Sequence, residues 1–288
     1  KPSSAASDVY KRQQGSRGWG LHFRRCAAVR VFRAKIFSGA DGVDPDASRD
    51  VALDGVFIHA WDDAVAVKTT VAGSPAANVA VANSIVSTRK SAFKLGTESL
   101  SNFTRVSFAA SDVFDSGRGL VIYAKDGGAF DDVAFEDLRL LEFYDYPGEP
   151  SAPVDFELEH RSGYSAVRGV RVERVVADWP SAAVLRGNDH VLLDGVAFAN
   201  TTLKVRAPFA AGNATFLFDC KNDDIAAGGV EVAGLDVDWG AHRGAWLGLS
   251  RRWADAVPGG GAASLCPDPP GARVAALLWA ARGAARGN

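Results

Sequence analysis

The sequence predicts an all-β fold, a single-stranded parallel β-helix in which the chain winds into stacked coils. Short strands with alternating apolar residues recur along the chain, and apolar positions return at similar intervals. No stretch of 3.6-residue periodicity separates these strands, which argues against intervening helices. A β-sandwich is the alternative, but it would favour hairpin turns and less recurrence of the same strand.

The interval is clearest in two apolar series. Consecutive steps of 22, 28, 27 and 27 residues separate Val29, Val51, Val79, Val106 and Val133. The next steps, 37 residues to Val170 and 21 to Val191, are less even and indicate loop insertions. A second series recurs every 22 residues, at Leu21, Val43 and Val65.

The strands fall into two families, so the sequence predicts two strands per coil and about eight coils. The first family occupies residues 28–37, 50–59, 78–86, 132–140, 169–177 and 190–199. The second occupies residues 64–68, 92–96, 120–125, 154–160, 183–189 and 216–223. Alternation is clear in residues 154–160, where Val, Phe and Leu face one side and acidic residues the other.

Three segments are expected. Residues 14–250 form the β-helix domain, expected to be truncated at its N-terminus because the chain has no methionine. Residues 1–13 contain DVYKRQ, the translation of a common sequencing adapter, and are interpreted as an assembly artefact or a disordered polar tail. Residues 251–288 are a Gly/Pro/Ala-rich tail, with either a capping helix near 274–282 or low-complexity sequence.

Composition excludes several classes of function. With 288 residues, 47% of them hydrophobic, the chain can bury one large core. Its formal charge of −2 creates no positive electrostatic field that would attract nucleic acid or an anionic membrane. No apolar run reaches the ~20 residues of a membrane-spanning helix. Three scattered cysteines predict neither a disulfide framework nor a zinc site, and no metal or other cofactor is expected.

Three aspartates are spaced at the interval of the repeat. Asp41 lies in GADGVDP at 39–45, and Asp62 and Asp63 follow 21 and 22 residues later in WDDAVAVK at 61–68. If each repeat is one coil, equivalent residues lie about 4.8 Å apart. The three carboxylates would then gather on one wall, as acid/base hydrolysis of a glycosidic bond requires.

These segments resemble glycoside hydrolase family 28, the polygalacturonases, which are right-handed parallel β-helices. GADGVDP resembles that family's Asn-Thr-Asp-Gly segment and WDDAVAVK its Gly-Asp-Asp segment, at the family's spacing. The resemblance implies that Asp62 is the general acid and that Asp41 and Asp63 hold and deprotonate the attacking water, with inversion at the anomeric carbon. It also implies a secreted, monomeric enzyme that acts on a polysaccharide or oligosaccharide. Inversion usually needs carboxyl groups about 6.5–9.5 Å apart.

The sequence departs from the family pattern at its substrate-binding positions. The family's Gly-His-Gly falls on Lys90-Ser91-Ala92, so Ser91 replaces the histidine, and its Arg-Ile-Lys falls on Val121-Ile122-Tyr123. The family's Arg and Lys bind the uronate carboxylate. Their loss argues against galacturonan and for an uncharged or differently charged sugar.

Polar side chains on the same wall are candidate substrate ligands: Lys68, Lys94, Glu98, Trp61, Tyr123 and Lys125. The alternation of the strands places the lysines opposite the apolar residues, and Trp61 could stack on a sugar ring. By the same parity Asp41 and Asp63 would point into the core. A buried charge needs a partner, so the strand must begin after Asp63, with a bend that turns both acids outward.

Two other functions stay open. The lost histidine, arginine and lysine are compatible with a β-helix that binds carbohydrate without cleaving it. A polysaccharide lyase on the same fold is a third hypothesis, in which Asp62, Asp63 and Glu98 hold Ca²⁺ and Lys94 is the base.

Overall fold

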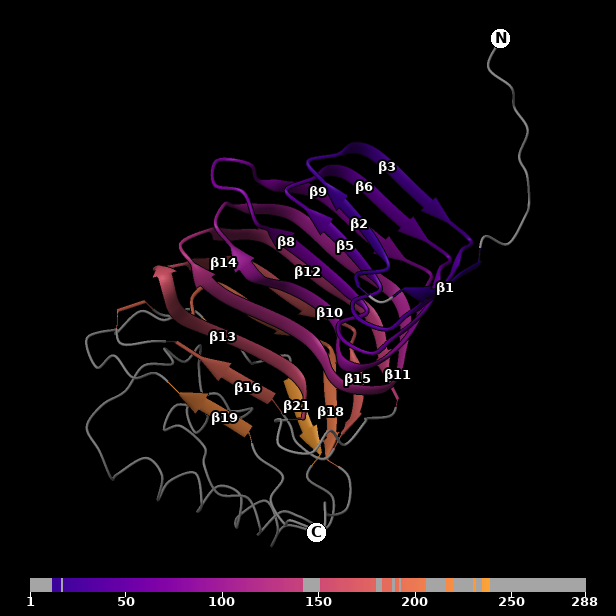
Figure 1. The fold of residues 1–288 in the computed structure, drawn as a ribbon. Helices are drawn as coiled ribbons and strands as arrows, with labels where there is room; N and C mark the ends of the chain where they lie inside the picture. Colours follow the sequence, from indigo (N-terminus) through magenta and orange to yellow (C-terminus); the bar gives the residue numbers. More distant parts are fainter. Residues whose placement is uncertain are drawn as a thin grey trace, which may run out of the picture.

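The fold is a parallel β-helix, as a computed structural model of the chain shows (Figure 1). The structure describes residues 12–16, 18–141, 151–179, 183–187, 190–191, 193–205, 216–219, 230–231 and 235–238. Every pairing between its named strands is parallel. The predicted fold class is therefore confirmed.

The strands form three walls. The wall that carries the aspartates, here called the site wall, consists of β2 (Leu21–Arg24), β5 (Val43–Asp46), β8 (Val65–Thr69), the C-terminal parts of β10 (Ile85–Ser99) and β11 (Phe103–Asp126), β13 (Ala152–Gly163), β16 (Ala183–Arg186) and β19 (Phe216–Asp219).

The second wall consists of β3 (Ala27–Phe32), β6 (Arg49–Asp54), β9 (Ala76–Ala82), the first parts of β11 and β12 (Ala129–Leu140), β14 (Ala166–Glu173), β17 (Val196–Ala199) and β20 (Val230–Glu231). The third consists of β1 (Arg12–Ser16), β4 (Lys35–Ser38), β7 (Phe57–Ala60), the first part of β10, the middle of β11, the end of β12, β15 (Val176–Trp179), β18 (Thr201–Val205) and β21 (Leu235–Asp238).

Each coil thus has three strands, and the prediction of two was wrong. Several segments that were predicted to be single strands contain a sharp corner between two strands. Residues 50–59, for example, span parts of both β6 and β7. The corner residues adopt positive φ in successive coils, at Arg33, Gly55, Asn83, Ala110, Asp137, Arg174 and Asn200. Three of them, Arg33, Ala110 and Arg174, carry side chains that rarely adopt this conformation, so these corners left little trace in the sequence.

The predicted register is confirmed for the early coils. Val29, Val51, Val79, Val106, Val133 and Val170 pair directly from coil to coil. The next partner is Val196, a step of 26 residues from Val170, and not Val191. The reason is that Gly195, with φ of 60°, occupies the position equivalent to Gly169, directly before the paired valine, so Val191 lies earlier in the coil, before the bridge between Leu193 and Val167.

The core is a stack of apolar side chains inside the coils. Phe93, Phe108, Phe135 and Phe156 follow one another with ring centroids 4.9, 5.3 and 5.7 Å apart. Such contacts add to the burial of each ring. Because one coil's ring rests on the next, the walls are rigid platforms for outward-facing groups.

The predicted tail, at residues 251–288 with a capping helix near 274–282, lies outside the described residues, as do residues 1–11. The proposed domain limits therefore stay predictions. Within the part of the chain that the structure describes, no helix is long and apolar enough to cross a membrane.

Candidate active site

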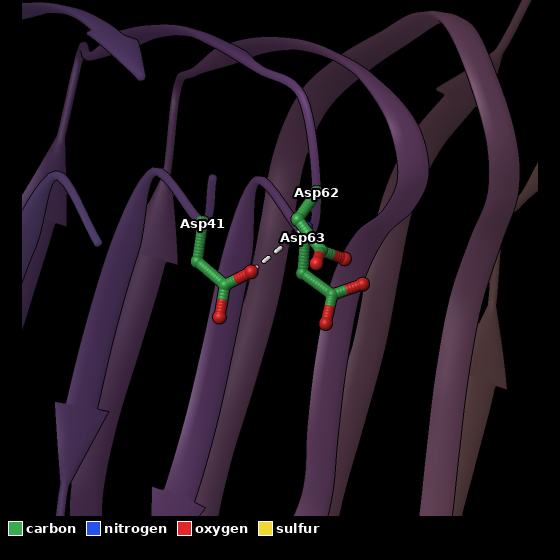
Figure 2. Close-up of side chains that lie close together, drawn as sticks. All are labelled: Asp41, Asp62 and Asp63. Carbon is green, nitrogen blue, oxygen red and sulfur yellow. Dashed lines mark hydrogen bonds between the residues drawn. The ribbon is translucent and has the colours of Figure 1, made fainter. Parts of the chain in front are cut away.

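The three aspartates lie together at the N-terminal edge of the site wall. Asp41 lies in the turn before β5, and Asp62 and Asp63 lie in the turn before β8 (Figure 2). The backbone N–H of Asp63 donates to Asp41 Oδ1 at 3.1 Å. Gly42 lets the two turns stack this closely, because a Cβ there would lie 2.5 Å from the carbonyl oxygen of Ala64.

The carboxylates are closer than the resemblance implied. One oxygen from each of the three aspartates lies within 4.8 Å of the others. This nearest-oxygen separation falls below the carboxyl spacing of about 6.5–9.5 Å common to inverting glycosidases. The reason is that Asp41 and Asp63 occupy equivalent positions of adjacent coils, whose strands lie about 4.8 Å apart.

Asp41 is buried and paired with Lys68 of β8. Lys68 Nζ donates to Asp41 Oδ2 at 2.6 Å and lies 3.0 Å from Asp44 Oδ1. All three side chains are almost inaccessible to solvent. Burial would lower the pKa of Lys68, but the charges of Asp44 and Asp41 outweigh it and raise that pKa. Lys68 is therefore a buried cation between two acids.

Asp63 has a matching partner in the next coil. Lys94 Nζ of β10 donates to Asp63 Oδ2 at 2.6 Å, and the N–H of Ser91 donates to Asp63 Oδ1 at 3.1 Å. Burial acts to raise the pKa of Asp63, but Lys94, Ser91 and Arg118 outweigh it and lower that pKa. β8 begins after Asp63, as predicted. Asp41 and Asp63 lie on the side of the wall opposite the core, where they contact Lys68 and Lys94, but they are buried there, and the lysines supply the partners that burial demands.

Asp62 differs from its two neighbours because its side chain is exposed. Crowding by protein atoms raises the pKa of its carboxyl, and the negative charges of Asp63 and Asp41 add to this effect. Lys94 and Lys90 act in the opposite direction but do not cancel it. The site therefore combines one accessible carboxyl that tends to hold a proton with two buried carboxylates.

In the described part of the chain, these aspartates are the one group of acidic, histidine or cysteine ligands close enough to hold a metal ion. A cation would have to compete with Lys68 for Asp41 and with Lys94 for Asp63. The charges of Asp41 and Asp63 are thus already neutralised by lysines, and this arrangement does not fit a site that holds a metal ion.

Arg118 is a functional candidate that the sequence reasoning missed. It lies beside Ser91 in the register of β10 and β11, its Nε donates to Ser91 Oγ at 3.3 Å, and its charge acts on Asp63. The signal was available, because Arg118 follows Ser91 by 27 residues, the repeat of this region. Alignment to the family's Arg-Ile-Lys pointed instead to residues 121–123.

The other predicted ligands lie on or beside the same wall, and each has a protein partner. Arg89 lies 3.6 Å from the ring centroid of the exposed Trp61. Lys125 pairs with Glu159 at 2.7 Å, and Glu98 lies 3.8 Å from Arg161.

Tyr123 donates to Asp155 at 2.6 Å. Lys94, Arg118 and Lys125 each lie 5.3–5.4 Å from its ring centroid. Burial raises the pKa of the Tyr123 hydroxyl, and the charge of Asp155 adds to this. The hydroxyl therefore stays protonated and remains a hydrogen-bond donor.

The buried carboxyl group of Asp44 should make the stability of the protein depend on pH in an unusual way. Burial, followed by the charge of Asp41, raises the pKa of Asp44 to about 9, although Lys68 lowers it. Between about pH 4 and pH 9 the folded protein holds a proton that the unfolded chain releases, so the free energy of unfolding falls as pH rises. Replacement of Asp44 by asparagine should remove this slope and stabilise the protein at about pH 8 relative to pH 5, by at least about 1 kcal/mol.

Urea unfolding at several pH values measures this effect. Asp131→Asn, at an exposed position of the second wall, is the control and should keep the wild-type slope. Equal slopes for wild type and Asp44→Asn would contradict the prediction.

Comparison with known proteins agrees with the fold. No family profile matches the chain, and no curated protein sequence matches it. Among solved structures, the chain is similar to a hyperthermoactive exopolygalacturonase from Thermotoga maritima, with a TM-score of 0.53 and 15% identity. The match covers 76% of this chain and 55% of that enzyme, so the chain spans about half of the enzyme's length. The comparison therefore supports the parallel β-helix fold.

Proposed function

We propose that this chain is a glycoside hydrolase that cleaves O-glycosidic bonds of an extracellular polysaccharide or oligosaccharide, acting as a monomer. The exposed Asp62 is the general acid, and Asp41 and Asp63 hold and deprotonate the attacking water. One observation carries the proposal: an accessible carboxyl with a raised pKa lies beside two buried carboxylates that lysines neutralise. Paired carboxyl groups in such different environments are the arrangement that acid/base hydrolysis uses.

The burial of the bases supports inversion. A nucleophile in a retaining enzyme must reach the anomeric carbon itself. Asp41 and Asp63 are each only 3% exposed, which suits contact with a small water molecule better than contact with a sugar ring. The short spacing of the carboxylates favours retention instead, so the stereochemistry of the product is the decisive observation.

The charge around Asp62 supports an acidic glycan. Lys90 acts electrostatically on Asp62, and Arg118 acts on Asp63 one coil away. The sequence had suggested an uncharged or differently charged sugar because no cation stood at residues 121–123. Arg118 restores a cation at the site from another position, and an anionic substituent on the sugar would complement it.

The test is a screen for new reducing ends on acidic and neutral polysaccharides, followed by NMR of the first product formed. The expected result is cleavage of an acidic polymer with the anomer inverted relative to the substrate. Retention of configuration would reject the water-activating role of Asp41 and Asp63. An unsaturated product that absorbs ultraviolet light would instead indicate a lyase.

A non-catalytic carbohydrate-binding β-helix is the second candidate. The observation that favours it is the locking of both bases in 2.6 Å ion pairs with lysines. Binding to a glycan without release of reducing ends, at every pH between about 4 and 8, would establish this alternative.

A further inference from the structure

Lys94 is buried and paired with Asp63, whereas a side chain that binds substrate is expected to be accessible to it. It extends from the site wall in register with Ala66 of the preceding coil, and its Nζ donates to Asp63 Oδ2 at 2.6 Å. Its side chain is 11% exposed, and its ammonium group is directed at Asp63, whose side chain is 4% exposed. A sugar hydroxyl or carboxylate would have to displace a buried, charge-assisted hydrogen bond.

The same coil also fixes the second oxygen of Asp63. Asp63 Oδ1 accepts a hydrogen bond from the backbone N–H of Ser91, three residues before Lys94. A backbone N–H only donates, so this partner favours the carboxylate over the protonated acid. Both carboxylate oxygens are therefore oriented by β10, and each keeps a further lone pair for a water molecule.

Charged and polar groups from several elements act on Asp63, and the balance among them decides its state. They are Lys94, Ser91 and Lys90 on β10, Arg118 on β11, Asp41 in the turn before β5, and Asp62 in the same turn as Asp63. Lys94 has the largest effect among those that lower the pKa of Asp63 against the opposing effect of burial.

We propose that Lys94 is a positioning residue that keeps Asp63 ionised and oriented as the base, and that it does not bind substrate. This inference rests on the proposed hydrolase function. In the step it supports, the water oxygen bonds to the anomeric carbon while one water proton passes to Asp63. The glycosidic C–O bond breaks, and Asp62 gives its proton to the leaving oxygen. Lys94 keeps its own proton throughout.

The pH profile of kcat/KM tests this role. Without the ammonium group, burial dominates and the pKa of Asp63 rises, so Lys94→Gln should move the acid limb upward by roughly 1–3 pH units. The KM should change less than about twofold, and Lys94→Arg should restore the profile in large part. Lys204→Gln, at an exposed position of the third wall, is the matched control. A raised KM with an unmoved acid limb would overturn the proposal in favour of substrate binding.

A second measurement separates this proposal from the proposed function. If wild type hydrolyses nothing, the dependence of unfolding on pH still reports the state of Asp63. In wild type the lowered pKa of Asp63 contributes stability that is lost as pH falls through it. In Lys94→Gln the contribution should reverse, with stability lost as pH rises, and Asp63→Asn/Lys94→Gln should abolish the reversal. An unchanged slope in Lys94→Gln would overturn the role of Lys94 whether or not the protein is an enzyme.

Discussion

Replacement of Asp62 by asparagine is expected to reduce kcat by a factor of about 10²–10⁴ on a natural polysaccharide, because the leaving oxygen loses its proton donor. Asparagine keeps the size of the side chain and removes the carboxyl whose pKa is raised by crowding and by Asp63 and Asp41. KM should change little, since the same surface is presented to the sugar. The measurement is steady-state release of reducing ends across the pH range.

The choice of substrate sharpens this experiment. An aryl glycoside with an acidic leaving group needs little protonation, so Asp62→Asn should retain far more activity on it than on the polysaccharide. The basic limb of the wild-type pH profile should also disappear in the variant. Asp131→Asn is the matched control, because it removes an exposed carboxylate far along the chain from the site. An equal loss on both substrates would exclude Asp62 as the general acid.

Replacement of Lys68 by methionine is expected to have the largest effect on stability. It would leave Asp41 as a buried carboxylate without its 2.6 Å partner and remove the cation beside Asp44. Loss of one member of a buried ion pair typically costs about 3–5 kcal/mol. The ring of Trp19, whose centroid lies 4.1 Å from Lys68 Nζ, would lose a cation–π contact as well.

Urea unfolding monitored by circular dichroism measures this loss, with Lys204→Met as the control on an exposed site. The double variant Asp41→Asn/Lys68→Met should recover part of the stability, because residue 41 then no longer carries a buried charge without its partner. Additive losses in the double variant would show that the two residues are not coupled, contrary to their geometry.

The sequence predicted the stacking of coils because the valine series reports strand pairing directly. A residue that pairs with its equivalent one coil later must recur at the coil length, and Val51 and Val79 do so. The same argument placed Asp41 and Asp63 side by side. It did not show the third strand of each coil, because corners such as Arg33, Ala110 and Arg174 fall on residues that give no turn signal.

The environment of the aspartates was harder to predict. Strand parity correctly placed Lys68 and Lys94 opposite the core, but parity does not say what covers that side of a strand. The lysines reach neighbouring coils and are covered there by Asp41 and Asp63. Arg118 was overlooked although it follows Ser91 by one repeat of 27 residues, because alignment to the family's Arg-Ile-Lys segment pointed to residues 121–123.

The coils also differ in length without any change of register. Two residues, 47–48, join β5 to β6, whereas six residues, 70–75, join β8 to β9, yet Val51 still pairs with Val79. The longer connection leaves the C-terminal edge of the site wall, while the aspartates occupy its N-terminal edge. The architecture is therefore modular: evolution or an engineer can exchange connections at one edge while the chemistry at the opposite edge keeps its geometry.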